Sequence, residues 1–197
     1  MDTDYFKGTI SISLVREALF SAEQRGFCTT TLLQQAGISP DLLQSDKARV
    51  SVTQYAQLWI VLANTMNDEF FGMDSHPMRR GSYTLLSKSV LSAENLGKAL
   101  QHILQFLNLL LDDFNSTCFV QENYAYIVIQ DTQHPKRMFS YATYLMLVHG
   151  LMCWLSGQRI VLNCIQLKCN APADDSDYKI RFCDDIQLLR RTTRITT

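Results

Sequence analysis

One run of the sequence restricts the possible folds more than any other, because residues Met138 to Leu155 carry no charged side chain at neutral pH. A helix of about this length can cross a membrane, since a span needs roughly 20 apolar residues. Ser140, Thr143 and His149 lie inside the run, which favours a helix in contact with protein. We therefore predict a long helix buried in the core, and no membrane partner.

Helical patterns dominate the chain before this run. Apolar residues at helical spacing predict a first helix over residues 11–25. A helix, a glycine turn and a second helix follow over residues 30–44. Ser51 and Gln54 form a capping box, which predicts a third long helix that ends near Asn67.

The next segment is expected to be a loop over residues 68–81, followed by a helix over residues 83–91. Ser92 is the predicted N-cap of a further helix. Apolar residues at helical spacing from Leu96 to Phe114 give that helix a broad apolar face. This face is one candidate surface for contact with a second copy of the chain, and the alternative is burial in the core.

Later runs have the aromatic, β-branched or alternating pattern of strands, at residues 118–120, 124–129, 160–169, 178–182 and 186–189. The first two predict a hairpin. The order of elements indicates an α+β fold in one domain over residues 1–197. We expect an N-terminal helical region followed by a small, mainly antiparallel sheet packed against the long buried helix.

Charge and motifs exclude several functions. The 18 Lys and Arg residues against 19 Asp and Glu residues leave no basic excess for holding DNA. The N-terminus lacks a signal-peptide pattern, so we expect a cytoplasmic protein with reduced cysteines. Metalloprotease, nucleophile-elbow, phosphate-loop and dinucleotide-binding motifs are absent, and the histidines lack ligand spacing. We expect no metal and no cofactor.

Two groups of side chains inside the apolar run and the hairpin are open to two interpretations. His149 lies one helical turn before Cys153, so the two could form a nucleophile pair, although a hydrogen-bonded core histidine is favoured. Tyr126, Tyr141, Tyr144 and His149 could line an effector pocket between helix and sheet. The alternative for the tyrosines is ordinary core packing.

The helix–turn–helix arrangement over residues 30–44 invites a DNA-binding interpretation. Its second helix, however, offers Asp41 and Asp46 before Lys47, and acidic groups repel phosphate. We therefore predict a structural helical hairpin without DNA contacts.

The same segment resembles the opening of the arabinose-binding-type N-terminal domain of AraC-family transcription regulators. Matches in order and spacing extend over about residues 10–190. The matching segments are residues 32–43, Arg49-Val50, Phe71-Gly72-Met73, Gly81-Ser82-Tyr83, residues 92–100, Ala171-Pro172, Asp177-Tyr178 and Phe182.

The resemblance implies the regulatory half of a transcription regulator, which senses a small-molecule effector, forms a homodimer, or both. It implies no catalytic residue. DNA would be bound through a C-terminal helix-turn-helix domain that this chain does not include. The competing hypothesis is a stand-alone small-molecule-binding protein or a Cys/His-dependent enzyme, for which rapid alkylation of Cys153 would be the sign.

Overall fold

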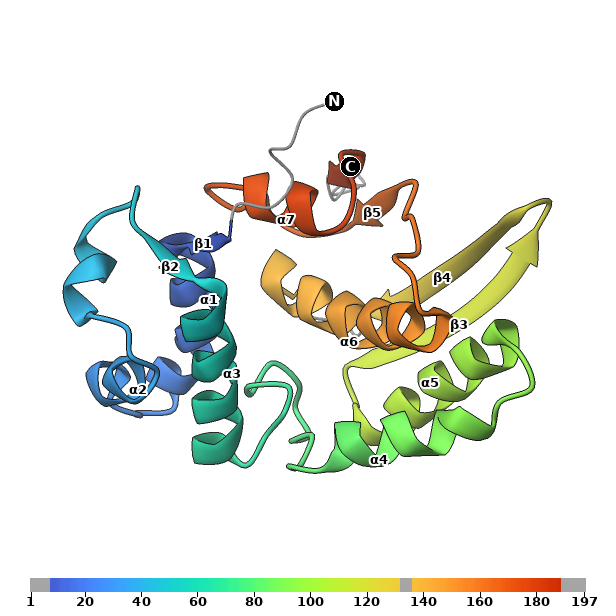
Figure 1. Cartoon of the computed structure of the whole chain (residues 1–197), viewed down its shortest axis with the longest axis horizontal. Coiled ribbons are helices and arrows are strands. Elements are labelled where there is room, and N and C mark those ends of the chain that lie inside the picture. Colours follow the sequence, from blue (N-terminus) through green and yellow to red (C-terminus); the bar gives the residue numbers. More distant parts are fainter. Residues whose placement is uncertain (1–7, 132–135, 189–197) are drawn as a thin grey trace, which may run out of the picture.

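Helix α6 (Met138–Ser156) lies at the centre of the protein, with the other elements arranged around it (Figure 1). The computed structural model describes residues 8–131 and 136–188. Among these residues, α6 is the helix long and apolar enough to cross a membrane, and more than half of it is buried inside the protein. The predicted buried helix is confirmed.

The N-terminal part lies to one side of α6. Its elements are β1 (Thr9–Ser11), α1 (Ile12–Gln24), α2 (Thr29–Gln35), η2 (Pro40–Gln44), β2 (Arg49–Ser51) and α3 (Val52–Met66). The capping box is confirmed, because Ser51 accepts from the Gln54 N–H and Gln54 accepts from the Ser51 N–H. The second helix predicted within residues 30–44 is a single short 3₁₀ segment, η2.

Strands β1 and β2 form an antiparallel pair that the sequence pattern did not predict, with Ile10 opposite Val50. Each strand leads directly into a helix, β1 into α1 and β2 into α3. The pairing therefore aligns the starts of these two helices.

Three buried carboxylates organise the loop between α3 and α4 (Ser82–Ser89): Asp68, Glu69 and Asp74. Each accepts backbone hydrogen bonds. The donors are the N–H groups of Phe70, Gly72 and Met78 for Asp68, of Gly81 and Tyr83 for Glu69, and of His76, Asp112 and Asp113 for Asp74. Buried carboxylates are tolerated where such donors satisfy their oxygens. The predicted loop is thus fixed by its own acidic residues.

Helix α4 leads through η3 (Val90–Ser92) into α5 (Leu96–Leu110). The predicted N-cap at Ser92 is wrong, because Asn95 accepts from the Lys98 N–H and begins the helix. Helix α5 also ends before Phe114, which belongs to the following strand. The apolar face of α5 is buried in the core, so it is not available to a second copy.

The predicted hairpin is confirmed and is longer than expected. Strand β3 (Phe114–Gln121) pairs antiparallel with β4 (Tyr124–Asp131) over the full length of both strands. Glu122 adopts a positive φ of 54° in the two-residue turn, a conformation typical of tight hairpin turns. The hairpin meets α5 and α6 at its open end and projects away from them toward its turn (Figure 1).

The C-terminal part covers the start of α6 and consists of β5 (Ile165–Leu167), α7 (Ser176–Arg181) and β6 (Ile186–Leu188). The predicted strand at 160–169 shortens to β5, and the last predicted strand is β6, although its end at Leu189 lies outside the described residues. The predicted strand at 178–182 is wrong. Tyr178 and Phe182 are both buried at i and i+4 spacing, which is one face of a helix.

The α+β class is confirmed. The strands of the described residues form three separate two-stranded sheets in place of one. Two of these are antiparallel, and β5 pairs with β6 in parallel.

Candidate functional site

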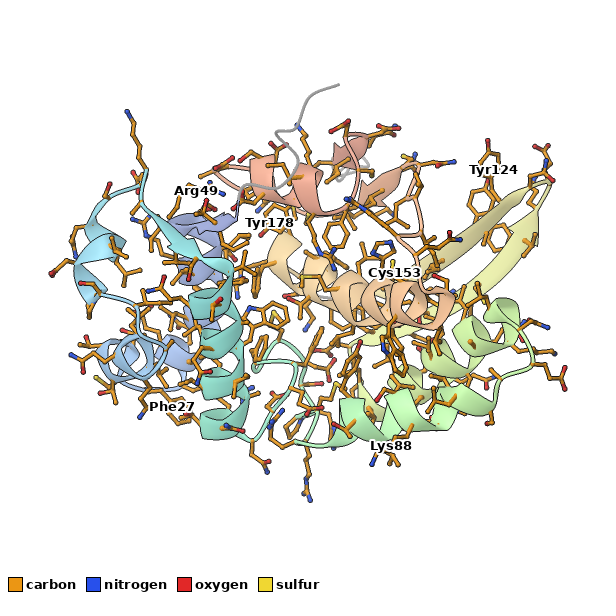
Figure 2. All side chains as sticks on the ribbon, viewed as in Figure 1. Phe27, Arg49, Lys88, Tyr124, Cys153 and Tyr178 are labelled. Atoms are coloured by element: carbon orange, nitrogen blue, oxygen red, sulfur yellow. The ribbon has the colours of Figure 1, made fainter. Side chains whose placement is uncertain are left out.

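A cavity of about 210 Å³ lies where three segments distant in sequence meet: α1, the start of α6, and the segment that leads into α7. Its lining residues are Glu17, Lys136, Arg137, Met138, Phe139, Asn170, Ala171, Pro172 and Tyr178. We call it the α1–α6–α7 cavity. Figure 2 shows Tyr178 between α7 and the first turns of α6.

Arg137 is the central charged group of this cavity. Its Nη1 forms an ion pair with the Glu17 carboxylate, and its guanidinium lies 4.0 Å from the centre of the Phe20 ring. Burial lowers the pKa of Arg137, while the Glu17 carboxylate opposes that shift. An arginine keeps its charge under such conditions. The pair joins α1 to the start of α6.

Lys136 extends from the cavity to the hairpin and to the loop before α4. Its Nζ forms an ion pair with Asp113 and donates to the Met73 carbonyl oxygen at 3.2 Å. Burial alone would raise the pKa of Asp113, but Lys136 and Ser75 outweigh it and lower that pKa. Lys136 is therefore a fixed part of the wall.

Helix α6 begins at the cavity without a cap. Its N-cap residue, Arg137, makes no side-chain cap hydrogen bond, and its first turn holds no acidic residue. The first N–H groups of a helix lack partners within the helix, and the helix dipole makes that end positive. Met138 and Phe139, the first residues of α6, line the cavity.

Tyr178 closes the opposite side. The residue is 4% exposed, and no hydrogen bond joins its hydroxyl to another residue within 8–131 or 136–188. Burial, with the nearby Glu17 carboxylate, raises the pKa of Tyr178. The phenol therefore stays protonated and can donate a hydrogen bond into the cavity.

Asp177 fixes α7, and so the position of Tyr178. Its carboxylate accepts from the Ser11 N–H at 2.6 Å and from Arg49 Nη2 at 2.9 Å. Burial would raise the pKa of Asp177, but these hydrogen bonds outweigh burial and lower it. Figure 2 shows Arg49 and Tyr178 on neighbouring segments. One wall of the cavity is thus tied to the β1–β2 pair.

A second, more open hollow of about 510 Å³ lies between η3 and α5. Within it, Ser89 Oγ lies 2.9 Å from His102 Nε2. Both residues are partly or fully exposed, as are Lys98, Gln101 and Gln105 along the same wall. With no buried polar group directed into it, this hollow offers a ligand less than the α1–α6–α7 cavity does.

The predicted effector residues lie elsewhere. Tyr144 is fully buried, shares a hydrogen bond with Ser116, and has a pKa that burial raises to about 12. Tyr141 is buried beside it. Tyr126 is 43% exposed on the hairpin and stacks on Phe119 at 5.0 Å.

Neither of the two cavities above is lined by any of Tyr126, Tyr141, Tyr144 and His149. The structure brings Tyr141 and Tyr144 together against Phe114. Tyr126 stacks on Phe119 instead, and His149 bonds the Ile160 carbonyl oxygen. Their part in effector binding stays a prediction.

His149 and Cys153 are close, but their geometry does not suit base catalysis. His149 Nε2 lies 2.7 Å from the Ile160 carbonyl oxygen, so this nitrogen carries the proton and donates it. The same nitrogen is the one 3.4 Å from Cys153 Sγ, and it cannot accept a second proton there. The Ile160 N–H in turn lies 3.3 Å from that sulfur. The two side chains hold Ile160 against α6.

Sequence reasoning missed Glu17, Arg137 and Tyr178. One signal was present, because Lys136 and Arg137 are the last charged residues before the apolar run. The start of a helix is the positive end of its dipole, so two adjacent cations are unfavourable there. Their presence indicates an anionic partner.

Comparison with known protein families identifies a match. A family model described as the arabinose-binding domain of AraC transcription regulators, N-terminal, matches residues 26–196. No curated protein and no solved structure matches the chain.

Proposed function

Because the chain belongs to the family of N-terminal arabinose-binding domains of AraC transcription regulators, we propose that it is the effector-sensing domain of such a regulator. It acts in the cytoplasm, binds a small molecule and controls a DNA-binding domain attached to it. It catalyses no reaction. An effector changes the equilibrium between two arrangements of such a domain only if it binds one arrangement more tightly than the other.

The α1–α6–α7 cavity is the observation that carries this proposal. An occupant would contact α1, the start of α6 and the segment before α7 at once. The volume of about 210 Å³ is below the 300–1,000 Å³ of typical drug-sized sites, which indicates a small metabolite. Binding there would change how these three segments are held together.

The test is a thermal-unfolding screen with pentoses, hexoses, amino acids and short carboxylic acids. A ligand at 100 times its Kd stabilises a protein by about 2.7 kcal/mol, so we expect at least one compound to raise the Tm by several degrees. Arg137→Gln should remove that rise. The matched control is Arg16→Gln. Arg16 lies on the exposed side of the same helix α1 and pairs with Asp46, so this variant should keep the rise in Tm.

A compound that stabilises Arg137→Gln as much as the unmodified protein would place the effector site elsewhere. If no compound of these classes raises the Tm, the chain does not sense a small metabolite of this kind.

We propose that the domain also forms a homodimer, and that the outer hairpin (residues 117–128) is its interface. The exposed apolar residues of this segment are Phe119, Val120, Tyr124, Tyr126 and Val128. Its one formal charge is Glu122, in the turn. In a two-fold contact the same patch of both copies meets, and residues at the axis meet their own copies, so an uncharged strand can pair with itself without repulsion.

The free edge of β4 supports the same interface. Asn108 bonds both the N–H and the carbonyl of Ser116, which therefore point away from β4. Ile129 lies opposite Ser116, so its backbone groups point away from β3, as do those of Ile127. No further strand pairs with this edge in the described part of the chain. A second β4 would complete it.

Sedimentation analysis tests the interface with two single-lysine variants. Val128→Lys puts a charge on the β4 surface and should give a monomer at a concentration where the unmodified protein is a dimer. Val161→Lys places the same charge at an exposed residue outside the hairpin and should remain a dimer. A dimer in Val128→Lys, or a monomer in the unmodified protein, would contradict the assignment.

A further inference from the structure

Resting on the proposed function, we infer that the effector of the α1–α6–α7 cavity is a small carboxylate, which takes the place of the Glu17 carboxylate on Arg137. The cavity collects hydrogen-bond donors from three directions. One of these donors, Arg137, already binds a carboxylate, that of Glu17.

The first donors belong to Arg137. Its hydrogen bonds to described residues, both to Glu17, involve Nη1 alone. The remaining N–H groups of the guanidinium fork are not used by the described part of the chain. Arginine binds carboxylates best through two parallel N–H groups, so a carboxylate that takes the whole fork can replace Glu17, which uses Nη1 alone.

The start of α6 supplies the second set of donors. This helix of 19 residues begins at the cavity with neither a side-chain cap nor an acidic residue in its first turn. The Ser140 N–H already donates to the Arg137 carbonyl oxygen at 3.0 Å. The N–H groups of Met138 and Phe139 and the positive end of the helix dipole favour an anion.

Tyr178 supplies a third donor and is an independent observation. The side chain is buried, lines the cavity, and has no hydrogen-bond partner for its hydroxyl among the described residues. The hydroxyl oxygen is not one of the buried atoms left without a partner in the described residues, so it is open to the cavity and can donate there to a ligand oxygen. Its position across the cavity from the start of α6 brings the donors together on one group.

The charges around the cavity favour an anion over a cation. Among the lining residues, Lys136 and Arg137 are basic and Glu17 is the acidic one. An anionic ligand keeps Arg137 paired, and the Glu17 side chain, 33% exposed, turns toward water. A cationic ligand would instead draw Glu17 away and stand beside the Arg137 charge.

The rest of the lining suits a short carbon chain. Met138, Phe139, Ala171 and Pro172 provide apolar surface beside the donors. A volume of about 210 Å³ favours a short carboxylate over a long one.

Exchange of partners on Arg137 would give the ligand a regulatory effect. The Glu17–Arg137 pair joins α1 to the start of α6. A carboxylate that occupies Arg137 releases α1 from this contact and holds α6 to Tyr178 instead.

The test compares butanoate, pentanoate and hexanoate with their uncharged primary amides by calorimetric titration. Hydrogen bonds to charged groups make the acids about tenfold tighter binders than the amides. Arg137→Gln should abolish this preference. Glu17→Gln should bind the acids several times more tightly, because the internal competitor is gone, and Arg16→Gln should match the unmodified protein.

Equal binding of acids and amides, or an unchanged preference in Arg137→Gln, would overturn the carboxylate assignment. If Arg137→Gln does not fold, the Glu17→Gln variant provides the test. Binding of the acids by Glu17→Gln that is unchanged or weaker rejects the exchange of partners on Arg137. Binding of none of the acids also rejects it. A sugar or another compound without a carboxylate that stabilises the protein through this cavity would leave the proposed sensing function intact while rejecting the carboxylate.

Discussion

The two halves of the β3–β4 hairpin share one continuous register but have opposite surroundings. In the inner half, Phe114 is 1% exposed and Ser116 is 2% exposed. In the outer half, Phe119 is 47% exposed and Val120 is 77% exposed. Strand pairing is the same in both halves, so it does not explain why only the inner side chains are buried.

Neighbouring elements produce the difference. Phe114 lies at the centre of an aromatic cluster, with its ring 5.2 Å from Phe70, 5.8 Å from Tyr141 and 5.3 Å from Tyr144. The outer half has one aromatic contact of its own, between Phe119 and Tyr126. The inner half is part of the core, whereas the outer half presents apolar surface without a covering element, which is the pattern of an interaction site.

Removing the central ring of the inner half should have the largest effect on stability. Phe114→Ala leaves a cavity between α6 and the loop before α4, so we expect a loss of about 3–5 kcal/mol in the free energy of unfolding. Urea unfolding measures this loss. A loss below about 1 kcal/mol would mean that the inner half is no better packed than the outer half.

Asn108 of α5 occupies the outer edge of β3, whereas the outer edge of β4 is free in the described part of the chain. Removing the Asn108 side chain should have the next largest effect on stability. Asn108→Ala leaves the Ser116 N–H and carbonyl without their side-chain partner. Such unpaired buried groups cost about 1–3 kcal/mol. Asn115→Ala, at an exposed residue of the same strand, is the control and should change the stability little. Equal losses in the two variants would contradict the assigned role of Asn108.

Tyr144 should make the inner half sensitive to alkaline pH. Burial raises the pKa of Tyr144 to about 12, above its ordinary value near 10. Its contribution is therefore complete below pH 10 and is lost as the pH rises toward 12. At neutral pH, Tyr144→Phe should cost about 1 kcal/mol through the lost hydrogen bond to Ser116.

Unfolding measured from pH 8 to pH 12 checks this prediction. The gap between the unmodified protein and Tyr144→Phe should narrow as the pH rises. Tyr55, Tyr83 and Tyr178 also have raised pKa values, through burial, but they are present in both proteins and cancel in the difference. A constant gap would show that Tyr144 titrates normally.

The smallest effect on stability is expected in the outer half. Phe119→Ser removes the stacking on Tyr126, and cross-strand pairs of this kind contribute about 0.2–1 kcal/mol. Unfolding should be measured at a dilution where the protein is monomeric. The same variant should weaken the proposed dimer, which sedimentation at higher concentration detects. A large loss of monomer stability would mean that the outer half is packed after all.

Local signals in the sequence predicted most helices and the hairpin correctly. The capping box at Ser51 and Gln54 and the apolar run of α6 are such signals, since each acts within one element. The α7 prediction failed because Tyr178, Ile180 and Phe182 alternate as a strand would, while contacts of Tyr178 and Phe182 with the core decide for a helix. Near the start of α5, Ser92 and Asn95 are both candidate N-caps, and Asn95 makes the capping hydrogen bond.

The candidate site could not be predicted from the sequence, for a different reason. Glu17, Arg137 and Tyr178 come from three distant segments, and no spacing rule connects them. The tyrosines of the sequence prediction were recognisable as amphipathic residues, but their surroundings depend on which elements cover them. Tyr144 is covered by the core, and Tyr126 is not.

The central position of α6 also has a consequence for how the protein is made. Helix α6 contacts α1 and α5, receives the Tyr83 hydroxyl on its Leu147 carbonyl oxygen, and packs Phe139 against Trp59. During synthesis, all of these earlier segments leave the ribosome before α6 does. Their apolar surfaces remain uncovered until Ser156 has emerged, and transiently exposed apolar surface favours aggregation. The time taken to translate α6 therefore sets how long the unfinished core is exposed to aggregation.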